Sequence, residues 1–176
     1  MKIACVLGPD FEDSEFKVPF DRFTAAGHEV TVIGHKRGAV LEGKSHKEKT
    51  TADIGIDEAR PEDFDALFIP GGHSPDALRG DQRMVQFVKA FANKPIFAIC
   101  HGPQLLLTAG MVNGRSLTAW KTVQGDLEHA GAKVSDREVV VDRNLVTSRQ
   151  PADLDAFTRE SLRLLSNHTG VRAPSR

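Results

Sequence analysis

The most informative stretch of this chain is IFAICHGP, at residues 96–103. Its first four residues are apolar, as expected of a buried strand, and Cys100 follows them directly. Gly102 permits a tight turn, and Pro103 suits the first position of a helix, where a missing N–H costs nothing. The stretch therefore predicts a strand, a sharp turn and a helix, with the Cys100 side chain exposed at the apex.

Similar apolar runs recur along the chain and alternate with amphipathic stretches. This alternation is typical of βαβ units, so we expect an α/β fold built on a parallel sheet. The predicted strands cover residues 3–7, 30–33, 66–69, 96–99 and the pair 138–141 and 145–148. The predicted helices cover residues 14–26, a segment after Asp81, residues 103–109 and 123–130, and a last helix that Pro151 opens.

Two stretches interrupt this pattern. Pro19 must lie in the first turn of the predicted helix over residues 14–26, or else kink it. The polar stretch over residues 36–51 contains two glycines and predicts a loop or small hairpin off the sheet, to which the sequence assigns no role. We expect residues 1–168 to form a single domain and residues 169–176 to form a frayed C-terminal tail.

The composition narrows the class of protein. The 176 residues carry a formal net charge of -1 without a long run of like charge, so nucleic acid is not expected as the main partner. The apolar run at residues 1–7 is too short for a signal peptide or a membrane span. We therefore expect a cytoplasmic protein with no membrane partner. Cys5 and Cys100 are expected to be free thiols, because a chain of this length needs no disulfide.

The predicted elbow gives Cys100 a chemical role. A thiol at a helix N-terminus meets unpaired N–H groups and the positive end of the helix dipole, which favour the thiolate and lower its pKa. His101 places an imidazole beside it in the chain. The alternative is a buried structural cysteine, which is the interpretation we give to Cys5 in the first strand. The other histidines lack partners at metal-ligand spacing, so no metal site is predicted.

Two other segments lie where the loops of such a site belong. Gly71 and Gly72 follow the predicted strand over residues 66–69, and their backbone N–H groups could face an oxyanion or simply form a turn. Glu12 and Glu15 lie at the junction of the first strand and helix. Acids at a helix start are usually structural, so periodicity alone leaves their role open.

Together these motifs resemble the PfpI-like family. That family belongs to the superfamily of the parkinsonism-associated deglycase and the class I glutamine amidotransferase domains. The resemblance spans nearly the whole chain. It rests on residues 11–15 before Pro19, residues 65–67 and 70–76, residues 98–104, residues 138–142, and residues 147–149 before 151–154.

The resemblance implies a fold and a set of site residues. The fold would be flavodoxin-like, with a doubly wound, mostly parallel sheet and helices on both faces, and the protein would form a homodimer or higher oligomer without a cofactor. Glu15 would lie against the Cys100 sulfur as a carboxylic acid that donates a hydrogen bond. The N–H groups of Gly72 and His101 would form an oxyanion hole, with His73 and Trp120 near the pocket mouth.

The resemblance also implies three functions, which the sequence leaves open. The first is a stress-response glyoxalase or deglycase that acts on methylglyoxal or its adducts through a Cys100 hemithioacetal, with Glu15 or His101 moving the proton. The second is a non-catalytic redox sensor or chaperone that uses oxidation of an exposed Cys100. The third is a cysteine peptidase whose His101 is oriented by Asp76 of a neighbouring subunit. This third hypothesis is disfavoured by the expectation that His101 points away from Cys100, because adjacent residues in an elbow rarely face one another. Glutamine amidotransfer is set aside because no His-x-Glu pair follows Cys100.

Overall fold

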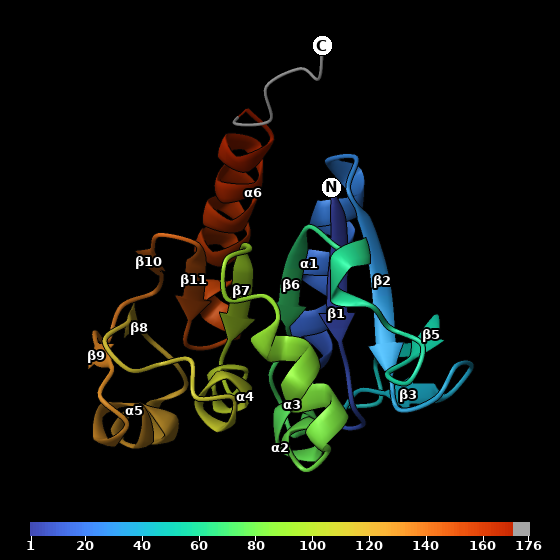
Figure 1. Cartoon of the computed structure of the whole chain (residues 1–176), viewed down its shortest axis with the longest axis horizontal. Coiled ribbons are helices and arrows are strands. Elements are labelled where there is room, and N and C mark those ends of the chain that lie inside the picture. Colours follow the sequence, from blue (N-terminus) through green and yellow to red (C-terminus); the bar gives the residue numbers. More distant parts are fainter. Residues whose placement is uncertain (171–176) are drawn as a thin grey trace.

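A seven-stranded sheet forms the centre of the molecule, shown in the computed structural model of Figure 1. The structure describes the backbone of residues 1–170 and the side chains of residues 1–168. The predicted frayed tail lies outside the described residues, except that the backbone of residues 169–170 ends the last helix. The strand order is β10-β11-β7-β6-β1-β2-β5, and all neighbours are parallel except β10 and β11.

The strands are β1 (Lys2–Val6), β2 (Glu29–Gly34), β3 (Val40–Glu42), β4 (Lys49–Thr51), β5 (Ile54–Gly55), β6 (Ala66–Ile69), β7 (Ile96–Ile99), β8 (Ser116–Leu117), β9 (Lys133–Val134), β10 (Val140–Asp142) and β11 (Leu145–Ser148). The helices are α1 (Asp13–Ala25), α2 (Ser74–Arg79), α3 (Gln82–Lys89), α4 (Pro103–Thr108), α5 (Lys121–His129) and α6 (Leu154–Gly170). Short 3-10 turns lie at Pro61–Asp63 and Pro151–Asp153. Outside the central sheet, β3 pairs with β4 and β8 pairs with β9.

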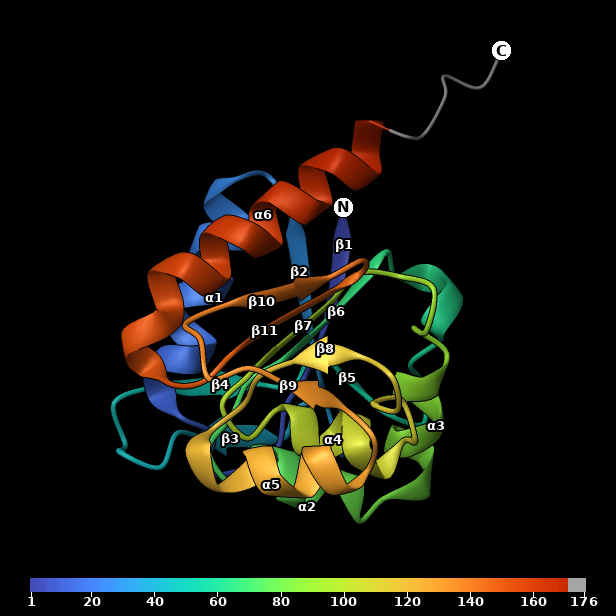
Figure 2. The same cartoon turned by 90° about the vertical axis from the view of Figure 1, so that its left-hand side faces the viewer.

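Helices cover both faces of the sheet, as the predicted doubly wound fold requires. Figure 2 shows α1 and α6 side by side on one face and α2 to α5 on the other. Each face has its own apolar core, one built around Phe23 of α1 and Phe157 of α6, and the other around Met84 of α3 and Leu105 of α4. The buried strands β6 and β7 supply residues to both cores because successive side chains alternate between the faces.

The strand order places the functional loops together. From β1 the chain crosses to β2 on one side and later to β6 on the other, so the sheet changes winding direction between β1 and β6. In open α/β sheets, ligands bind at the carboxyl ends of the strands beside such a switch point. Here the loops that follow β1, β6 and the adjacent β7 meet at this edge.

Most of the predicted elements are confirmed, one predicted placement is wrong, and one helix was not predicted. Strands β6 and β7 have the predicted bounds, and Asp81 caps α3 by accepting a bond from the Arg83 N–H. Pro19 lies inside α1 beyond its first turn, so the predicted first-turn placement is wrong. It therefore cannot donate to the carbonyl of Glu15 within the helix. Helix α2 was not predicted because its six residues are too short to show a period.

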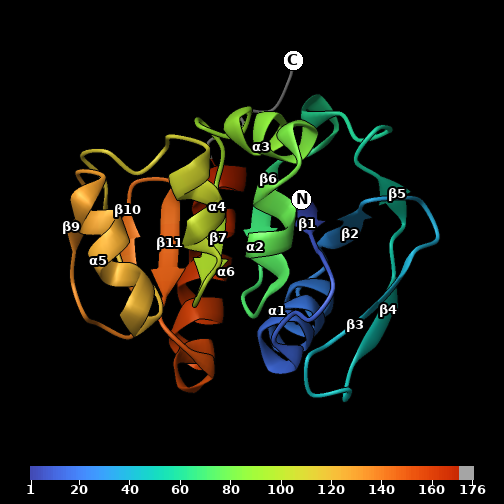
Figure 3. The ribbon, with the colours of Figure 1, turned by 90° about the horizontal axis from the view of Figure 1, so that it is seen from below.

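The segment over residues 36–51 is the predicted hairpin, formed by β3 and β4, and the structure gives it a role. Figure 3 shows the hairpin alongside α1. The carboxylate of Asp13, at the start of α1, accepts hydrogen bonds from the N–H groups of Ser45, Lys47 and Glu48, each 2.9 Å long. Asp13 is only 4% exposed. This carboxylate therefore holds the hairpin loop against the first helix.

Among the described residues, no helix has both the length and the apolar character needed to cross a bilayer.

We predict that Asp13→Asn lowers the free energy of unfolding by about 2 kcal/mol at neutral pH, because an amide has one acceptor oxygen for three N–H donors. Although burial opposes its ionisation, the N–H groups of Ser45, Glu48 and Lys47 lower the pKa of Asp13. Because the pKa of Asp13 is lower in the folded protein than in the unfolded chain, its carboxylate stabilises the fold at pH values above the ordinary pKa of an Asp. This stabilisation is lost as the pH falls through the folded-state pKa. The difference in stability between wild type and Asp13→Asn should therefore shrink on acidification, as measured by urea unfolding.

Asp21→Asn is the matched control, since Asp21 is exposed and makes only a surface pair with Lys17. It should change the free energy of unfolding by less than about 0.5 kcal/mol. Equal stability of the two variants would contradict the role given to Asp13.

Candidate active site

The predicted elbow is present at the end of β7. Cys100 has a φ of 63°, in the left-handed region that non-glycine residues rarely adopt. Its N–H donates to the carbonyl of Ser148 on β11 at 2.9 Å, and its carbonyl accepts from the N–H of Trp120 at 2.9 Å. The Gly102 N–H closes the turn onto the carbonyl of Ile99 at 2.8 Å. Because these bonds fix the backbone on both sides, the direction of the Cys100 side chain is fixed as well.

Two glycines allow the loops to pack closely around Cys100. A Cβ on Gly71 would collide with Oε1 of Glu15 and would lie 2.8 Å from Cβ of Cys100. A Cβ on Gly102 would lie 2.6 Å from the carbonyl oxygen of Ile69. The loop after β6 therefore touches both Cys100 and Glu15, which brings residues from α1, β6 and β7 into one cluster.

The sulfur itself is less accessible than the sequence predicts. Cys100 is 6% exposed, so the prediction of an exposed thiol at the apex is wrong. Burial raises the pKa of Cys100, and so does the ionised form of Glu15, whereas the N–H groups of His101 and Gly72 lower it. Burial therefore acts against the low-pKa thiolate predicted at this helix N-terminus, because desolvation by the surrounding loops opposes the N–H donors.

Glu15 is the second buried group of the site. Its side chain is fully buried, and neither of its oxygens makes a hydrogen bond of good geometry within the described residues. Burial raises the pKa of Glu15 to about 8, and the nearby Cys100 thiol and Gly71 N–H offset this only in part. Glu15 is therefore a neutral carboxylic acid at neutral pH and can donate a proton to a group beside the sulfur.

His101 faces the sulfur, contrary to the expectation that these neighbours point apart. Its Nδ1 lies 3.3 Å from Sγ of Cys100. The left-handed backbone at Cys100 turns the two side chains toward the same space. The imidazole is half-buried and stacks on Trp120, with the ring centroids 6.0 Å apart. Burial, together with the nearby Lys44 and His73, lowers the pKa of His101, so the ring is neutral at neutral pH and can accept a proton.

The two N–H groups expected in an oxyanion hole lie close to the sulfur. Those of Gly72 and His101 both lower the pKa of Cys100. Gly72 has a φ of 76°, which suits glycine. Its neighbours are fixed, since Glu12 donates to the Gly71 carbonyl at 3.2 Å and His73 donates to the Asp10 carbonyl at 2.8 Å. An oxygen bound next to the sulfur would meet the same two donors.

The remaining predicted residues surround this centre. Glu12 caps α1 and accepts a hydrogen bond from the Ser14 hydroxyl at 3.0 Å. His73 is exposed at the start of α2, close enough for its charge to influence His101. Asp76 is also exposed on α2, where it pairs with Arg79 at 2.7 Å. Within this chain it does not orient His101, and its contribution to a neighbouring subunit stays a prediction.

One further residue of the site, Lys44, is marked by no pattern in the sequence. Lys44, in the loop of the β3–β4 hairpin, places its Nζ 3.1 Å from Oε2 of Glu12. Its positive charge lowers the pKa of both Glu15 and His101. The sequence shows only a lysine in a polar stretch, and no motif marks it.

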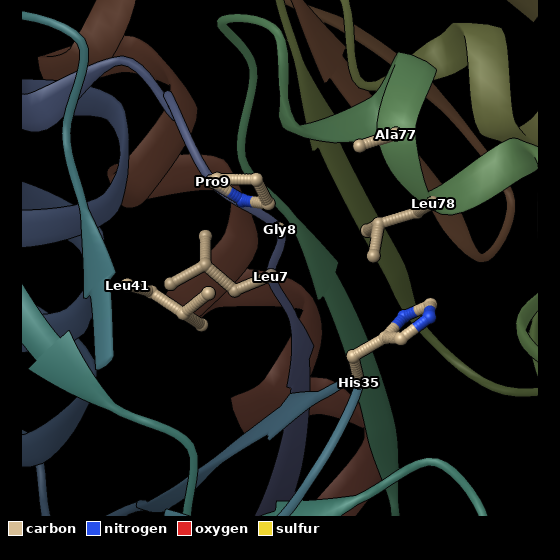
Figure 4. A pocket seen from close by; sticks show the side chains of 7 residues that line it. All are labelled: Leu7, Gly8, Pro9, His35, Leu41, Ala77 and Leu78. Carbon is tan, nitrogen blue, oxygen red and sulfur yellow. The ribbon is translucent and has the colours of Figure 1, made fainter. Parts of the chain in front are cut away.

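A separate hollow of about 350 Å³ lies at the carboxyl end of β1. Figure 4 shows Leu7, Leu41 and Leu78 around it, with His35 at its edge. Neither Cys100 nor Glu15 lines it. In the part of the chain that the structure describes, no group of three or more His, Cys, Asp or Glu residues is arranged to hold a metal ion.

Comparison with known proteins identifies close relatives. The chain is 55% identical over 167 residues to protein/nucleic acid deglycase 2 of Escherichia coli (strain K12), a match that covers 93% of this chain and 97% of the relative. It is 54% identical over 167 residues to general stress protein 18 of Bacillus subtilis (strain 168), with the same coverage of both chains.

Solved structures share the fold. A protein from Anabaena variabilis with DJ-1/ThiJ/PfpI-like and ferritin-like domains superposes with a TM-score of 0.91 at 38% identity. This match covers 94% of the present chain and 48% of the two-domain chain. Drosophila melanogaster DJ-1beta superposes with a TM-score of 0.82 at 24% identity, over 96% of this chain and 97% of that one.

The model of the DJ-1/PfpI family matches residues 1–164, which include Glu15, Gly72, Cys100 and His101. The chain belongs to the DJ-1/PfpI family.

Proposed function

We propose that this protein is a stress-related deglycase that frees amines from their methylglyoxal adducts. It also converts free methylglyoxal to lactate, and both reactions proceed through Cys100. The observation that carries the proposal is the arrangement around Sγ, with the His101 imidazole at 3.3 Å, two backbone N–H donors and a buried, protonated Glu15. The names of two close relatives, protein/nucleic acid deglycase 2 and general stress protein 18, support it. The low exposure of Cys100 disfavours a freely oxidised sensor.

In the first step, the thiol adds to the aldehyde carbon. Neutral His101 takes the Sγ proton while the new S–C bond forms, and the carbonyl electron pair moves onto oxygen. The N–H groups of Gly72 and His101 stabilise this oxyanion, and Glu15 protonates it. The product is a hemithioacetal, with His101 protonated and Glu15 ionised.

In the second step, the hemithioacetal rearranges without an external oxidant. Ionised Glu15 removes the C–H proton of the former aldehyde carbon while protonated His101 gives its proton to the ketone oxygen, and an enediol forms. Glu15 then returns its proton to the neighbouring carbon, and His101 takes the proton of the hydroxyl on the former aldehyde carbon. The product is a thioester, so the aldehyde carbon is oxidised and the ketone carbon is reduced. Water then adds to the thioester, the C–S bond breaks, and lactate leaves as the thiol is regenerated.

A glycated amine enters by the same route. Its aldehyde carbon carries the amine as a hemiaminal, and the Cys100 sulfur displaces that amine. Neutral His101 takes the Sγ proton as the S–C bond forms, and Glu15 gives its proton to the departing amine as the C–N bond breaks. The repaired amine leaves, and the remaining hemithioacetal follows the path described for free methylglyoxal.

Removal of the nucleophile gives the first test of this proposal. Cys100→Ala should lower the rate of lactate formation from methylglyoxal by at least about three orders of magnitude, because no other group can form the S–C bond. Cys5→Ala is the matched control, since Cys5 is buried in β1 away from the site. A Cys100→Ala protein that keeps wild-type activity would refute the proposal.

The pKa of Glu15 gives a second test. Because the first step needs protonated Glu15, kcat/KM should fall as pH rises through about 8, and it should fall again on acidification as His101 becomes protonated. Glu15→Gln should abolish the alkaline decrease and leave a rate about a hundredfold lower. Both effects are measured by stopped assays of the rate of lactate formation, from acidic pH to values above about 8.

Glu29→Gln, an exposed change on β2, is the control and should keep the wild-type profile. Persistence of the alkaline decrease in Glu15→Gln would show that another group is responsible for it.

A further inference from the structure

Lys44 lies at the rim of the site and has no role in the proposed chemistry. Its side chain is 44% exposed, and its Nζ lies 3.1 Å from Oε2 of Glu12, whose side chain is 17% exposed. One side of the ammonium group therefore contacts Glu12, and the other side is open to solvent. The ammonium group interacts electrostatically with Glu12, Glu15 and Cys100, so it lies near the sulfur.

The backbone around Lys44 is fixed, which keeps its ammonium group near the site. The Lys44 N–H donates to the carbonyl of Phe11 at 2.9 Å, and the carboxylate of Asp13 holds the loop residues that follow. Phe11 also forms β-bridges with both Gly43 and Gly72. Backbone contacts thus connect three segments, which are the loop of the β3–β4 hairpin, the start of α1, and the loop after β6 that contains Gly72.

The charges near the sulfur leave room for an anion. Glu15 and His101 are neutral at neutral pH, so Glu12 and Lys44 are oppositely charged groups beside an uncharged centre. The charge of Glu12 is shared between Lys44 and the Ser14 hydroxyl. An incoming phosphate or carboxylate could therefore bind the exposed side of the ammonium group without displacing the pair.

We propose that Lys44 is a specificity-determining residue. It selects 2-oxoaldehyde substrates that carry an anionic group, such as a phosphate or a carboxylate, next to the oxoaldehyde. This inference rests on the proposed function, because it assigns the substrate class of the same site. Glu12 opposes the selection by partly neutralising the ammonium charge, which keeps neutral substrates acceptable.

Alkylation of Cys100 tests the inference without any turnover. Iodoacetate and iodoacetamide have similar shapes but differ by one negative charge, so the ratio of their rate constants reports anion selection at the sulfur. Lys44→Gln should lower the iodoacetate-to-iodoacetamide ratio about tenfold, and Lys44→Arg should restore it. Glu12→Gln should raise the ratio. Lys47→Gln, a change in the same loop at an exposed lysine, should leave it as in wild type.

Turnover supplies the second readout, with methylglyoxal and its anionic analogue hydroxypyruvaldehyde phosphate as substrates. Lys44→Gln should lose about tenfold more kcat/KM on the phosphate-bearing aldehyde than on methylglyoxal. An alkylation ratio that is unchanged in Lys44→Gln, or that falls equally in Lys47→Gln, would overturn the inference. A wild-type protein that turns over neither aldehyde while its alkylation ratio depends on Lys44 would refute the proposed function and leave the anion site standing.

Discussion

The left-handed backbone of Cys100 is the constraint on which the site depends. A φ of 63° is unfavourable for cysteine, and the bonds to Ser148 and Trp120 hold it in place. This conformation turns the thiol toward α1 and brings the His101 ring to the same side. With an extended residue at this position, the strand would continue past the carboxyl edge of the sheet. Sulfur, imidazole and Glu15 would then have no common space.

Enclosure determines the protonation of the groups around the sulfur. Because the loops after β1, β6 and β7 exclude water, burial favours the neutral forms of Glu15, His101 and Cys100. The site therefore contains neutral proton donors and acceptors, and its charged pair, Glu12 and Lys44, lies toward the solvent. This arrangement suits an uncharged thiol and aldehyde that react through two simultaneous proton transfers.

Local sequence patterns predicted the elements that local forces determine. Strands β6 and β7 are four-residue apolar runs followed by turn residues, and their bounds follow directly from that pattern. The elbow followed from Cys100, Gly102 and Pro103. Long-range effects could not be read in this way. The burial of Cys100 depends on Gly71 and Glu15, which lie far from it in the chain, and the role of Lys44 depends on hairpin bonds to Asp13. The position of Glu15 against the sulfur came from family resemblance, because at a helix start it looks like any acid.

The proposed chemistry depends most on Glu15 being an un-ionised carboxylic acid beside the Cys100 sulfur at neutral pH. Infrared difference spectroscopy between wild type and Glu15→Gln measures this directly, since a protonated carboxyl has a C=O stretch that a carboxylate lacks. We expect a protonated-carboxyl band at neutral pH that is absent from Glu15→Gln and disappears as pH rises past about 8. A carboxylate band for Glu15 at neutral pH would contradict it.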